Sequence, residues 1–568
     1  MEQKASTPIS GDIEASHEPG APILRSSSDQ IKEPIRSSQD ASDFQDGENH
    51  VIYIVGVRFW LIIASLAMSL FLTNLEIPIV TTSLVAITND FGRFDNVGWI
   101  ISSYLLGYVG VLVIFAKLSD IFGRKLMLSL SISIFILFSA GCGASQSLTQ
   151  LIILRAFQGV GGAGCFALAS VMLTELVPPE KLAQYVANLS TVYAISLLCG
   201  PIIGGAISSR STWRWVFLLN IPAAAPALIF AIFALPKNFP HHGQLDRPRR
   251  TFKTLIAKET TQKVDLMGAG LLLLATLSMT AGFEEADSQF PWKSAYVISL
   301  LTISGILWIS LVLWERYITN HSKTVEPVLP WRFMQDRAML SLLLNAVFLG
   351  GPWFVAIFQL PQKFQLVHGS SGLRAGIQTM PFTFAAPIGS AFSSMMASKL
   401  KIPAIFIVLV SGVLQTIGFA LLASLPESSH IPPRTYGYQV IAGFGCGINI
   451  STLLLIVPFV VEYRDKAVGM AAVSQLRVMG GAIVLAIATS VFNSYTRPKL
   501  AQFLESGHLA GESIPSVQSL AQFSVQDQES IKGILAHGYN LQMWVLCAFA
   551  IAQIPSALLL WRKKQIMV

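Results

Sequence analysis

The chain has 568 residues, of which 52% are hydrophobic and only 12% are charged, and its mean hydropathy is +0.57. Soluble domains carry nearer a quarter charged residues, so this composition excludes an ordinary soluble protein and favours a chain that spans the lipid bilayer. The net charge of +7 does not indicate a nucleic-acid partner, because Lys and Arg lie in short runs between apolar segments and not in one patch.

The chain begins with a polar segment, residues 1–50, that is rich in Ser, Asp, Glu and Pro. It lacks the apolar core of a cleavable signal peptide. It also carries too little apolar surface to fold alone. We therefore expect a disordered cytoplasmic tail.

The rest of the chain is a series of apolar segments, each about 20 residues or more in length, as a membrane-spanning helix requires. Their approximate limits are 58–87, 98–117, 126–144, 149–175, 185–208, 214–235, 265–283, 294–314, 338–361, 373–397, 402–424, 436–460, 467–493 and 540–561. The sequence thus predicts an all-α polytopic membrane protein with about 14 transmembrane helices.

These segments are grouped as six, two and six by polar connections. We expect an N-terminal six-helix bundle, a basic cytoplasmic linker, an additional helix pair, a cytoplasmic connection, a C-terminal six-helix bundle that includes a long external loop, and a short cytoplasmic tail. Their limits are 51–236, 237–264, 265–314, 315–337, 338–561 with the loop at 494–539, and 562–568. Two packed bundles suit a rocking transporter with its site between them.

Basic residues of the short loops set the orientation. The linker 237–264, the loop with Arg124 and Lys125, and the tail after Arg562 fall on one side, whereas the acidic connection 284–287 falls on the other. Lys and Arg are enriched in cytoplasmic loops, so both termini are predicted to be cytoplasmic.

The first polar string reads Ala116-Lys-Leu-Ser-Asp-Ile-Phe-Gly-Arg-Lys125 and joins the second and third apolar segments. Gly123 permits a tight turn there. Asp120 ends one helix, and Arg124 and Lys125 open the next. An acid and a base at this spacing can bridge neighbouring helices in one state and part in another. A basic loop that only sets the topology is the alternative.

The second string, Leu154-Arg-Ala-Phe-Gln158-Gly159-Val-Gly-Gly162, places Arg155 inside an apolar segment, where a charge requires a partner or a water-filled cavity. Glu76 is a plausible partner. The first segment runs outward, so Glu76 reaches the outer half, and Arg155 lies about 10 Å below the outer surface at 1.5 Å per residue. We hypothesise that the two lie across the central cavity, paired or coupled through water. An Arg held by carbonyl groups is the alternative.

The third string is Gly200-Pro201-Ile-Ile-Gly204-Gly205. Pro201 removes a backbone donor and bends its helix. The glycines let a neighbouring backbone approach closely. A bent and tightly packed helix can control leakage between the bundles, although ordinary small-residue packing would give the same pattern.

Later polar residues complete the candidate set. The string Trp213–Pro222 suits a membrane interface, and Arg477, followed by Gly480 and Gly481, lies near mid-membrane, either facing the cavity or forming a packing salt link. Other candidates for the cavity wall, each equally suited to join helices to one another, are Asn74, Asn345, Gln359, Gln415 and Asn449.

Together these strings resemble the major facilitator superfamily, and within it the fourteen-span drug:proton antiporters, of which fungal multidrug and toxin exporters look most similar. The string 116–125 resembles motif A, with departures at Ala116, Ser119 and Ile121. The string 154–162 resembles motif B, and 200–205 resembles motif C, which marks antiporters.

The resemblance implies the major facilitator fold and assigns roles to these residues. Motif A, with Asp120, Gly123, Arg124 and Lys125, would latch the cytoplasmic side while the pump faces outward. Motif B, with Arg155, Gln158 and Gly159, implies a part in proton coupling.

The expected function is therefore proton-coupled export of small amphipathic organic compounds, by alternating access, from a multi-pass protein of the plasma membrane that works as a monomer. The partners are protons, the organic substrates and the lipid bilayer. A vacuolar basic amino-acid transporter or a siderophore transporter of the same fold stays open. A non-transporting membrane sensor is less favoured, because motif C and the buried charges are present.

Catalysis is not expected, because the sequence has no nucleotide-binding loop, no zinc-protease motif and no convincing nucleophile triad. The cysteines lie in apolar stretches without metal-binding spacing; they are Cys142, Cys165, Cys199, Cys446 and Cys547. We therefore expect neither a metal nor a cofactor.

Overall fold

The computed structural model describes residues 53–91, 98–236, 239–240, 262–287, 290–322, 324–428, 430–506, 524–563 and 565–566. The predicted tail 1–50 and most of the predicted linker 237–264 lie outside the described residues. So do residues 507–523 of the predicted external loop. Within the described ranges the chain is helical, and pairing of extended backbone is limited to two isolated bridges.

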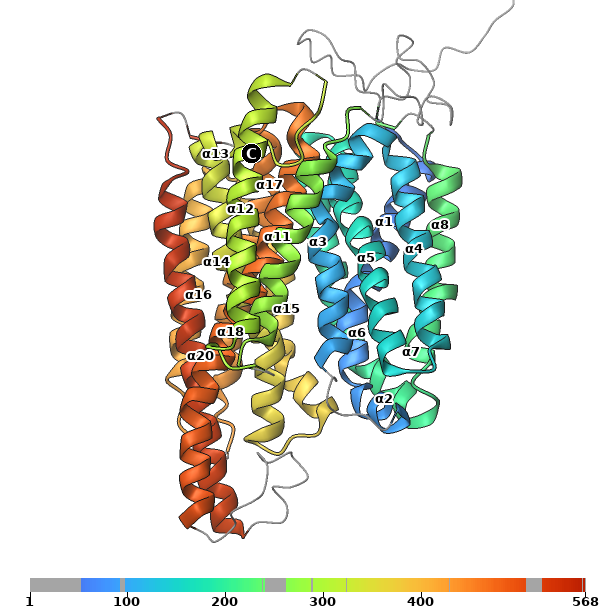
Figure 1. The fold of residues 1–568 in the computed structure, drawn as a ribbon. Coiled ribbons are helices and arrows are strands. Elements are labelled where there is room, and N and C mark those ends of the chain that lie inside the picture. Colours follow the sequence, from blue (N-terminus) through green and yellow to red (C-terminus); the bar gives the residue numbers. More distant parts are fainter. Residues whose placement is uncertain are drawn as a thin grey trace, which may run out of the picture. The chain divides into compact units, whose positions relative to one another are not determined.

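The first half of the chain forms a bundle of long helices (Figure 1). Its elements are α1 (Val57–Thr81), the short α2 (Leu84–Phe91), α3 (Gly98–Phe122), α4 (Arg124–Ala144), α5 (Leu148–Leu176), α6 (Pro179–Arg210), α7 (Trp215–Leu218) and α8 (Asn220–Ala234). Helices α3 and α5 pack closely, as do α4 and α5 and α1 and α6.

The second half repeats this plan after an inserted helix pair. The pair is α11 (Leu266–Glu285) and α12 (Ala295–His321), followed by the single turn α13 (Arg332–Gln335). The second bundle contains α14 (Arg337–Leu366), α15 (Gly372–Ser398), α16 (Ala404–Ala423), α17 (Arg434–Val460), α18 (Lys466–Ser506) and α20 (Val525–Leu558).

Every predicted apolar segment coincides with a helix, which confirms the all-α polytopic fold. Among the described residues, 13 helices are long and apolar enough to cross a membrane. The remaining predicted segment is α15, a helix of 27 residues that contains Pro381, Pro387 and several hydroxyl side chains. These polar groups lower its hydropathy, although its length is sufficient for a span.

The predicted external loop 494–539 differs from the structure at both of its ends. Helix α18 continues to Ser506, and α20 begins at Val525. The two extensions are joined by a buried cluster that consists of Val367, Leu500, Ile531, Leu535, Ala536 and Tyr539. These apolar residues are too widely spaced to raise the mean hydropathy, so a search for membrane-spanning segments does not detect them.

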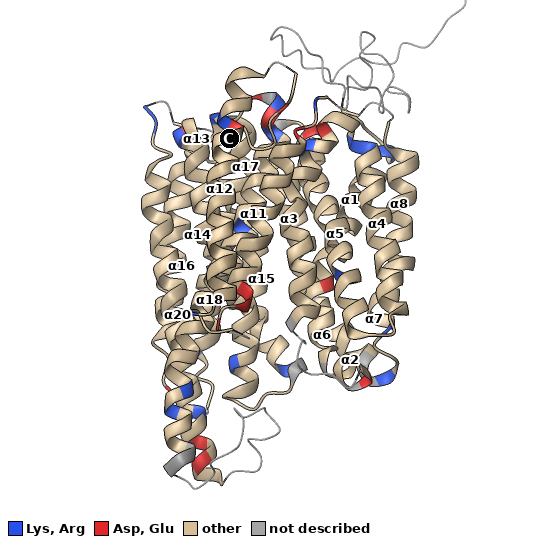
Figure 2. Cartoon of the chain, in the orientation of Figure 1, with Lys and Arg blue, Asp and Glu red and all other residues tan. Residues whose placement is uncertain are grey.

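Charged side chains gather at the two ends of the helices, and long apolar stretches lie between them (Figure 2). We call these the α13 end, which carries α13 and the loop between α3 and α4, and the α2 end, which carries α2 and α7 (Figure 1). The outer surface of the mainly apolar zone between the two ends suits a hydrocarbon solvent, and the few charges at that level, such as Glu76 and Arg155, are buried (Figure 2).

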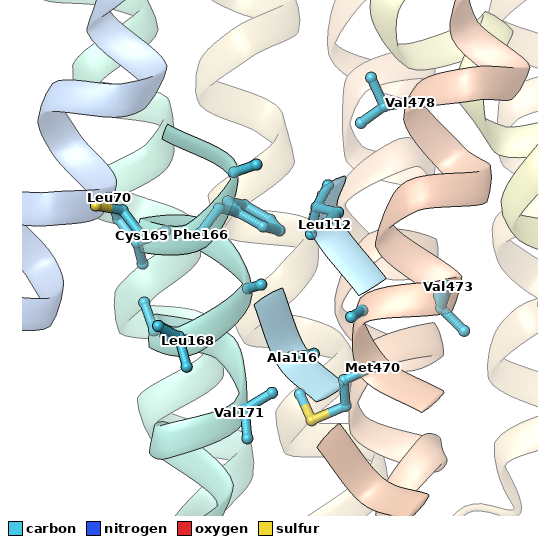
Figure 3. Packing of buried hydrophobic residues seen from close by; sticks show 14 of the residues in the cluster. Leu70, Leu112, Ala116, Cys165, Phe166, Leu168, Val171, Met470, Val473 and Val478 are labelled. Atoms are coloured by element: carbon cyan, nitrogen blue, oxygen red, sulfur yellow. The ribbon is translucent and has the colours of Figure 1, made fainter. Parts of the chain in front are cut away.

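The two bundles contact each other in the half nearer the α13 end. Ala116 of α3 lies beside Met470 of α18, and Val171 of α5 belongs to the same buried cluster (Figure 3). Hydrogen bonds accompany this packing: the Val113 amide donates to Gln475 Oε1 at 3.1 Å, and Ser394 Oγ donates to the Ala183 carbonyl at 2.7 Å. The bundles are therefore closed against each other on this side.

Candidate functional site

A cavity of about 910 Å³ lies between the two bundles. Its wall is formed by α1, α3, α5 and α6 of the first bundle and by α14, α15 and α18 of the second. It includes residues at the α2 ends of their helices, such as Thr81, Arg210, Gln365 and Ile377. The bundles meet near the α13 end, and the described cavity extends from there toward the α2 end.

The cavity wall is mainly apolar and aromatic, with scattered hydroxyl and amide groups. Its rings are those of Tyr104, Tyr108, Phe166, Tyr193, Phe354 and Phe358. The charged residues in the wall are Arg210 and Arg477, and no Asp, Glu or Lys belongs to the described wall. Such a surface suits an amphipathic organic molecule better than a small hydrophilic ion.

Two of the six sequence-predicted cavity residues, Asn74 and Arg477, line this cavity. Asn345, Gln415 and Asn449 are instead buried within the second bundle. Asn449 Nδ2 donates to Asn345 Oδ1 at 2.9 Å and to Gln553 Oε1 at 2.5 Å, and Gln415 Nε2 donates to Gln553 Oε1 at 3.0 Å. These amides join four helices to one another, which was the alternative role for them. Gln359 is buried and is not part of the wall either.

The structure brings Glu76 and Arg155 into a direct ion pair inside the first bundle. Arg155 Nη1 lies 2.5 Å from Glu76 Oε1, and both side chains are 0% exposed. The predicted position across the central cavity differs from this geometry, because neither residue lines the cavity. Tyr104 lies between the ion pair and the cavity, since it belongs to the cavity wall and its ring centroid is 4.7 Å from the Arg155 guanidinium.

Further hydrogen bonds tie this ion pair to other helices of the first bundle. Asn220 Nδ2 of α8 donates to Glu76 Oε2 at 2.7 Å, so both carboxylate oxygens have donors. Arg155 also donates to the Ile100 carbonyl at 2.9 Å and to Gln158 Oε1 at 3.0 Å. A charge pair removed from water is stable only with such additional bonds.

The remaining contacts of the pair involve ring faces and a hydroxyl group. Gln158 Nε2 donates to Ser139 Oγ of α4 at 2.7 Å. Arg155 Nη2 has no hydrogen-bond partner among the described residues, and the guanidinium lies against the rings of Tyr104 and Phe217. Protonation of Glu76 would leave this guanidinium without its counter-charge in a low dielectric.

Sequence reasoning did not include Asn220, Ser139 and Tyr104 among the site residues. Asn220 had a signal, because it is the polar residue that follows the apolar run Val216–Leu219. Ser139 had none, since a serine in an apolar helix commonly bonds to its own backbone.

The predicted latch residues of motif A form a compact charge cluster at the α13 end. Arg124 Nη2 lies 2.6 Å from Asp120 Oδ1 and 2.6 Å from Glu175 Oε1 of α5. Gly123 has a φ of 99°, which favours glycine, and it makes the turn that brings Arg124 back to α3. Lys125 Nζ donates to the Leu235 carbonyl at 2.8 Å.

The departures from motif A have visible consequences in this cluster. Ser119 Oγ accepts a hydrogen bond of 2.5 Å from Arg124 Nη1, which the alanine usual at that position could not do. Ile121 is apolar and buried, so this position supplies no charge to the cluster. Glu175 was missed from the sequence, although an acid in the last turn of an apolar helix is an available signal.

Glycines of motifs B and C mark close approaches between helices. A Cβ atom on Gly159 would lie 2.1 Å from the Tyr104 carbonyl oxygen. Cβ atoms on Gly200 and Gly204 would lie 2.5 Å from Pro78 Cγ and 2.4 Å from the Ile79 carbonyl oxygen of α1. These contacts lock α6 against α1.

Two other residues of motif C have a different environment. Pro201 and Gly205 belong to the cavity wall, and a Cβ atom on Gly205 would meet nothing within 4 Å.

The aromatic string 213–222 anchors the α2 end. Trp213 Nε1 and Arg214 Nη1 each donate to Asp90 Oδ2 at 3.0 Å, and these two bonds hold the pKa of the Asp90 carboxyl below its usual range. Farther along, the same string supplies Asn220 to the buried ion pair.

Comparison with known proteins places these features in a family. A model of the Major Facilitator Superfamily matches residues 60–485. The chain is 38% identical over 549 residues to the MFS-type transporter FPY5 of Fusarium mangiferae, with 97% of this chain and 90% of that protein covered.

Similarity extends to two other proteins and to a solved structure. Identity is 28% over 464 residues with the MFS thioclapurine efflux transporter tcpA of Claviceps purpurea, covering 81% of this chain and 82% of that protein. It is 26% over 473 residues with Multidrug resistance protein 3 of Bacillus subtilis, covering 82% and 87%. A bacterial homologue of the human lysosomal transporter Spinster, in an inward-facing and unoccupied conformation, shares the fold with a TM-score of 0.56 at 15% identity, covering 90% of this chain and 100% of that chain.

Proposed function

The chain belongs to the Major Facilitator Superfamily, and from this premise we propose that it is a proton-coupled antiporter that exports small amphipathic organic compounds by alternating access. It is a multi-pass membrane protein whose family and fold point to transport rather than catalysis.

The observation that carries the proposal is the cavity between the bundles. Its volume of about 910 Å³ accommodates a drug-sized molecule, and its wall combines rings with a few polar groups. A cavity that is open at one end and closed at the other is the arrangement that alternating access requires. Two similar proteins are named as an efflux transporter and a multidrug resistance protein, which supports export as the direction.

The orientation in this proposal follows from the basic loops. The α13 end carries Lys117, Arg124, Arg332 and Arg562. We assign it to the cytoplasm by the positive-inside rule, with both termini on that side. The cavity then opens outward, as the last stage of export requires. Efflux from the cell favours the plasma membrane, and one chain contains both bundles, so a monomer suffices.

Proton coupling is assigned to the pair Glu76–Arg155. A proton that enters from the outward-open cavity and reaches Glu76 would neutralise the carboxylate and break its bond with Arg155. Because the pair joins α1 to α5, and Asn220 joins it to α8, this change alters how the helices of the first bundle are held. Substrate and proton then need only bias the same equilibrium between outward-open and inward-open states.

An accumulation assay tests the proposal. Cells that express the chain are loaded with a panel of fluorescent drugs and fungal toxins, with and without a proton uncoupler, beside cells that express Arg155→Ala. We expect lower accumulation with the intact chain, restored by the uncoupler and lost in the variant. Unchanged accumulation across the panel in cells with confirmed surface expression would contradict proton-driven export.

A further inference from the structure

Arg477 is a buried cation without a partner among the residues that the structure describes. Its side chain is 6% exposed, and its Nε atom is buried with no hydrogen-bond partner. Among the described residues, no ion pair, hydrogen bond or ring-face contact is formed by the Arg477 side chain. A charge at this depth is costly and normally pairs with another group or faces a cavity.

The position of Arg477 is near the middle of the membrane. It lies eleven residues after Lys466, which starts α18 at the α13 end. At 1.5 Å per residue this is about 17 Å along a helix that crosses a hydrocarbon core of about 30 Å. The side chain is therefore too deep to reach bulk water at the closed end.

Close packing fixes the backbone that carries Arg477. A Cβ atom on Gly350 of α14 would lie 2.1 Å from the Arg477 carbonyl oxygen, and one on Gly480 would lie 2.2 Å from the Val347 carbonyl oxygen. The turn that carries Arg477 is thus held against α14 without room for adjustment. A guanidinium presented from such a rigid helix is preorganised for a ligand.

The described wall of the cavity provides no acid that could neutralise Arg477. The other charged residue of the described wall is Arg210, which is also basic. Glu76 is buried behind Tyr104 and already paired with Arg155. The wall therefore carries a formal charge of two positive units, one from each arginine.

Two tyrosines extend the donor set around Arg477. Tyr108 and Tyr193 line the same cavity as Arg477. Trp353 Nε1 donates to the Tyr193 hydroxyl oxygen at 3.1 Å, which leaves the hydroxyl hydrogen of Tyr193 free to donate to another acceptor. Donors without an acceptor in the wall are what an anionic group of a ligand would satisfy.

A smaller chamber of about 80 Å³ adjoins the same residues on the side of the α13 end. Phe166, Tyr193 and Arg477 belong to both cavities, and the rest of the smaller wall is largely apolar, with Leu454 and Trp353 among its residues. Apolar surface thus lies on both sides of the arginine. A ligand with one acidic group on an apolar body matches this arrangement.

We propose that Arg477, with the hydroxyl groups of Tyr108 and Tyr193, forms an anion-binding subsite and that the exported compounds are amphipathic organic acids. The proposal rests on the proposed function, because it takes the cavity as the transport site. It also disfavours basic amino acids as cargo, since they would meet two like charges.

Equilibrium binding to the full chain in detergent at neutral pH tests the subsite. The probes are three acids with different apolar bodies, namely 1-naphthaleneacetate, 4-phenylbutyrate and dodecanoate, each beside its neutral amide. We expect each acid to bind the unchanged chain about tenfold or more tightly than its amide, as a charge-assisted bond in a dry site would give. R477Q should remove this advantage while it leaves amide binding intact.

Two further variants separate the charge from the fold. R477K should keep part of the preference for acids, because it retains the charge without the planar fork. R210Q should keep most of it, because Arg210 is exposed at the mouth of the cavity. Melting temperature and elution volume establish that each variant is folded.

The possible results separate this inference from the proposed function. Acids that bind no better than amides, or not at all, would overturn the inference, as would an unchanged preference in R477Q. Uncoupler-sensitive export of neutral compounds without any preference for acids would contradict the anion-binding subsite and still support proton-driven export. Tight binding of acids without export from cells would support the anion-binding subsite and contradict the proposed export.

Discussion

Arg155 and Arg477 are both buried in apolar helices, but only Arg155 has a carboxylate partner. Glu76 lies 2.5 Å from Arg155, and the pair is further bonded to Asn220 and Gln158. Arg477 faces a cavity without any acid in its described wall. The same residue type thus has two different environments, one paired inside the bundle and one at the cavity wall.

The first prediction concerns the charge of Glu76. Glu76→Gln keeps the shape of the side chain but leaves Arg155 as an uncompensated buried charge, which we expect to cost about 3–5 kcal/mol of stability. Transport that remains should lose its dependence on the proton gradient. Melting temperature in detergent and efflux at several external pH values measure the two effects.

A double variant provides the control for that prediction. Glu76→Gln with Arg155→Met removes both charges, and we expect it to regain much of the lost stability, because apolar replacement of a buried pair is often neutral. Efflux by folded Glu76→Gln that still follows the proton gradient as the unchanged chain does would exclude Glu76 as the coupling group.

At the scale of elements, the glycines of motif C have different environments, and only some of them contact α1. Gly200 and Gly204 face α1 so closely that added atoms would meet its backbone and Pro78. Gly205 is adjacent in sequence but belongs to the cavity wall. One face of α6 thus packs against a helix, and another face lines the transport path.

This difference makes a matched pair of substitutions. Gly204→Ala would place a Cβ atom 2.4 Å from the Ile79 carbonyl oxygen, so we expect it to force α6 from α1 and to cost about 1–3 kcal/mol. Gly205→Ala meets nothing within 4 Å and should change stability by less than about 0.5 kcal/mol. Thermal unfolding of the two proteins side by side makes the comparison, and equal losses would contradict the assigned packing.

At the scale of the whole described transporter, closure at the α13 end is maintained by contacts that must break for the cavity to open at that end. One of them is the ion pair between Lys117 of α3 and Glu326, which precedes α13, at 2.7 Å. Glu326 is 46% exposed, so the pair contributes about 1 kcal/mol or less to the closed state. Several such weak contacts together allow an equilibrium that substrate and protons can shift.

Removal of that ion pair should therefore change the population of outward-open molecules. In a protein with Thr81→Cys at the cavity mouth, we expect Glu326→Gln to slow labelling by a membrane-impermeant thiol reagent by up to about fivefold. Glu462→Gln is the control, because its partner Arg464 is two residues away in the same loop. Identical labelling rates in all three proteins would show that Lys117–Glu326 does not stabilise the closed end.

The fold was predictable because membrane-spanning helices can be identified from the length and hydropathy of apolar segments, and all predicted segments coincide with helices. The contact of Glu76 with Arg155 could be anticipated from depth alone, since two charges at one level of a bundle have few other partners. The amide network around Gln553 could not, because depth does not tell which face of a helix points inward. The full lengths of α18 and α20 could not be predicted, because the apolar residues of their extensions are too widely spaced to raise the mean hydropathy.

The long extensions of α18 and α20 also give the transporter a practical handle. The helices have 41 and 34 residues, or about 62 and 51 Å, so they exceed the hydrocarbon thickness of about 30 Å. In electron micrographs of single particles, a rigid rod beyond the detergent belt would guide alignment of an otherwise featureless disc. Because the rod continues two helices of the second bundle, a spectroscopic label near its tip would act as a lever that magnifies the rocking of that bundle into a measurable displacement.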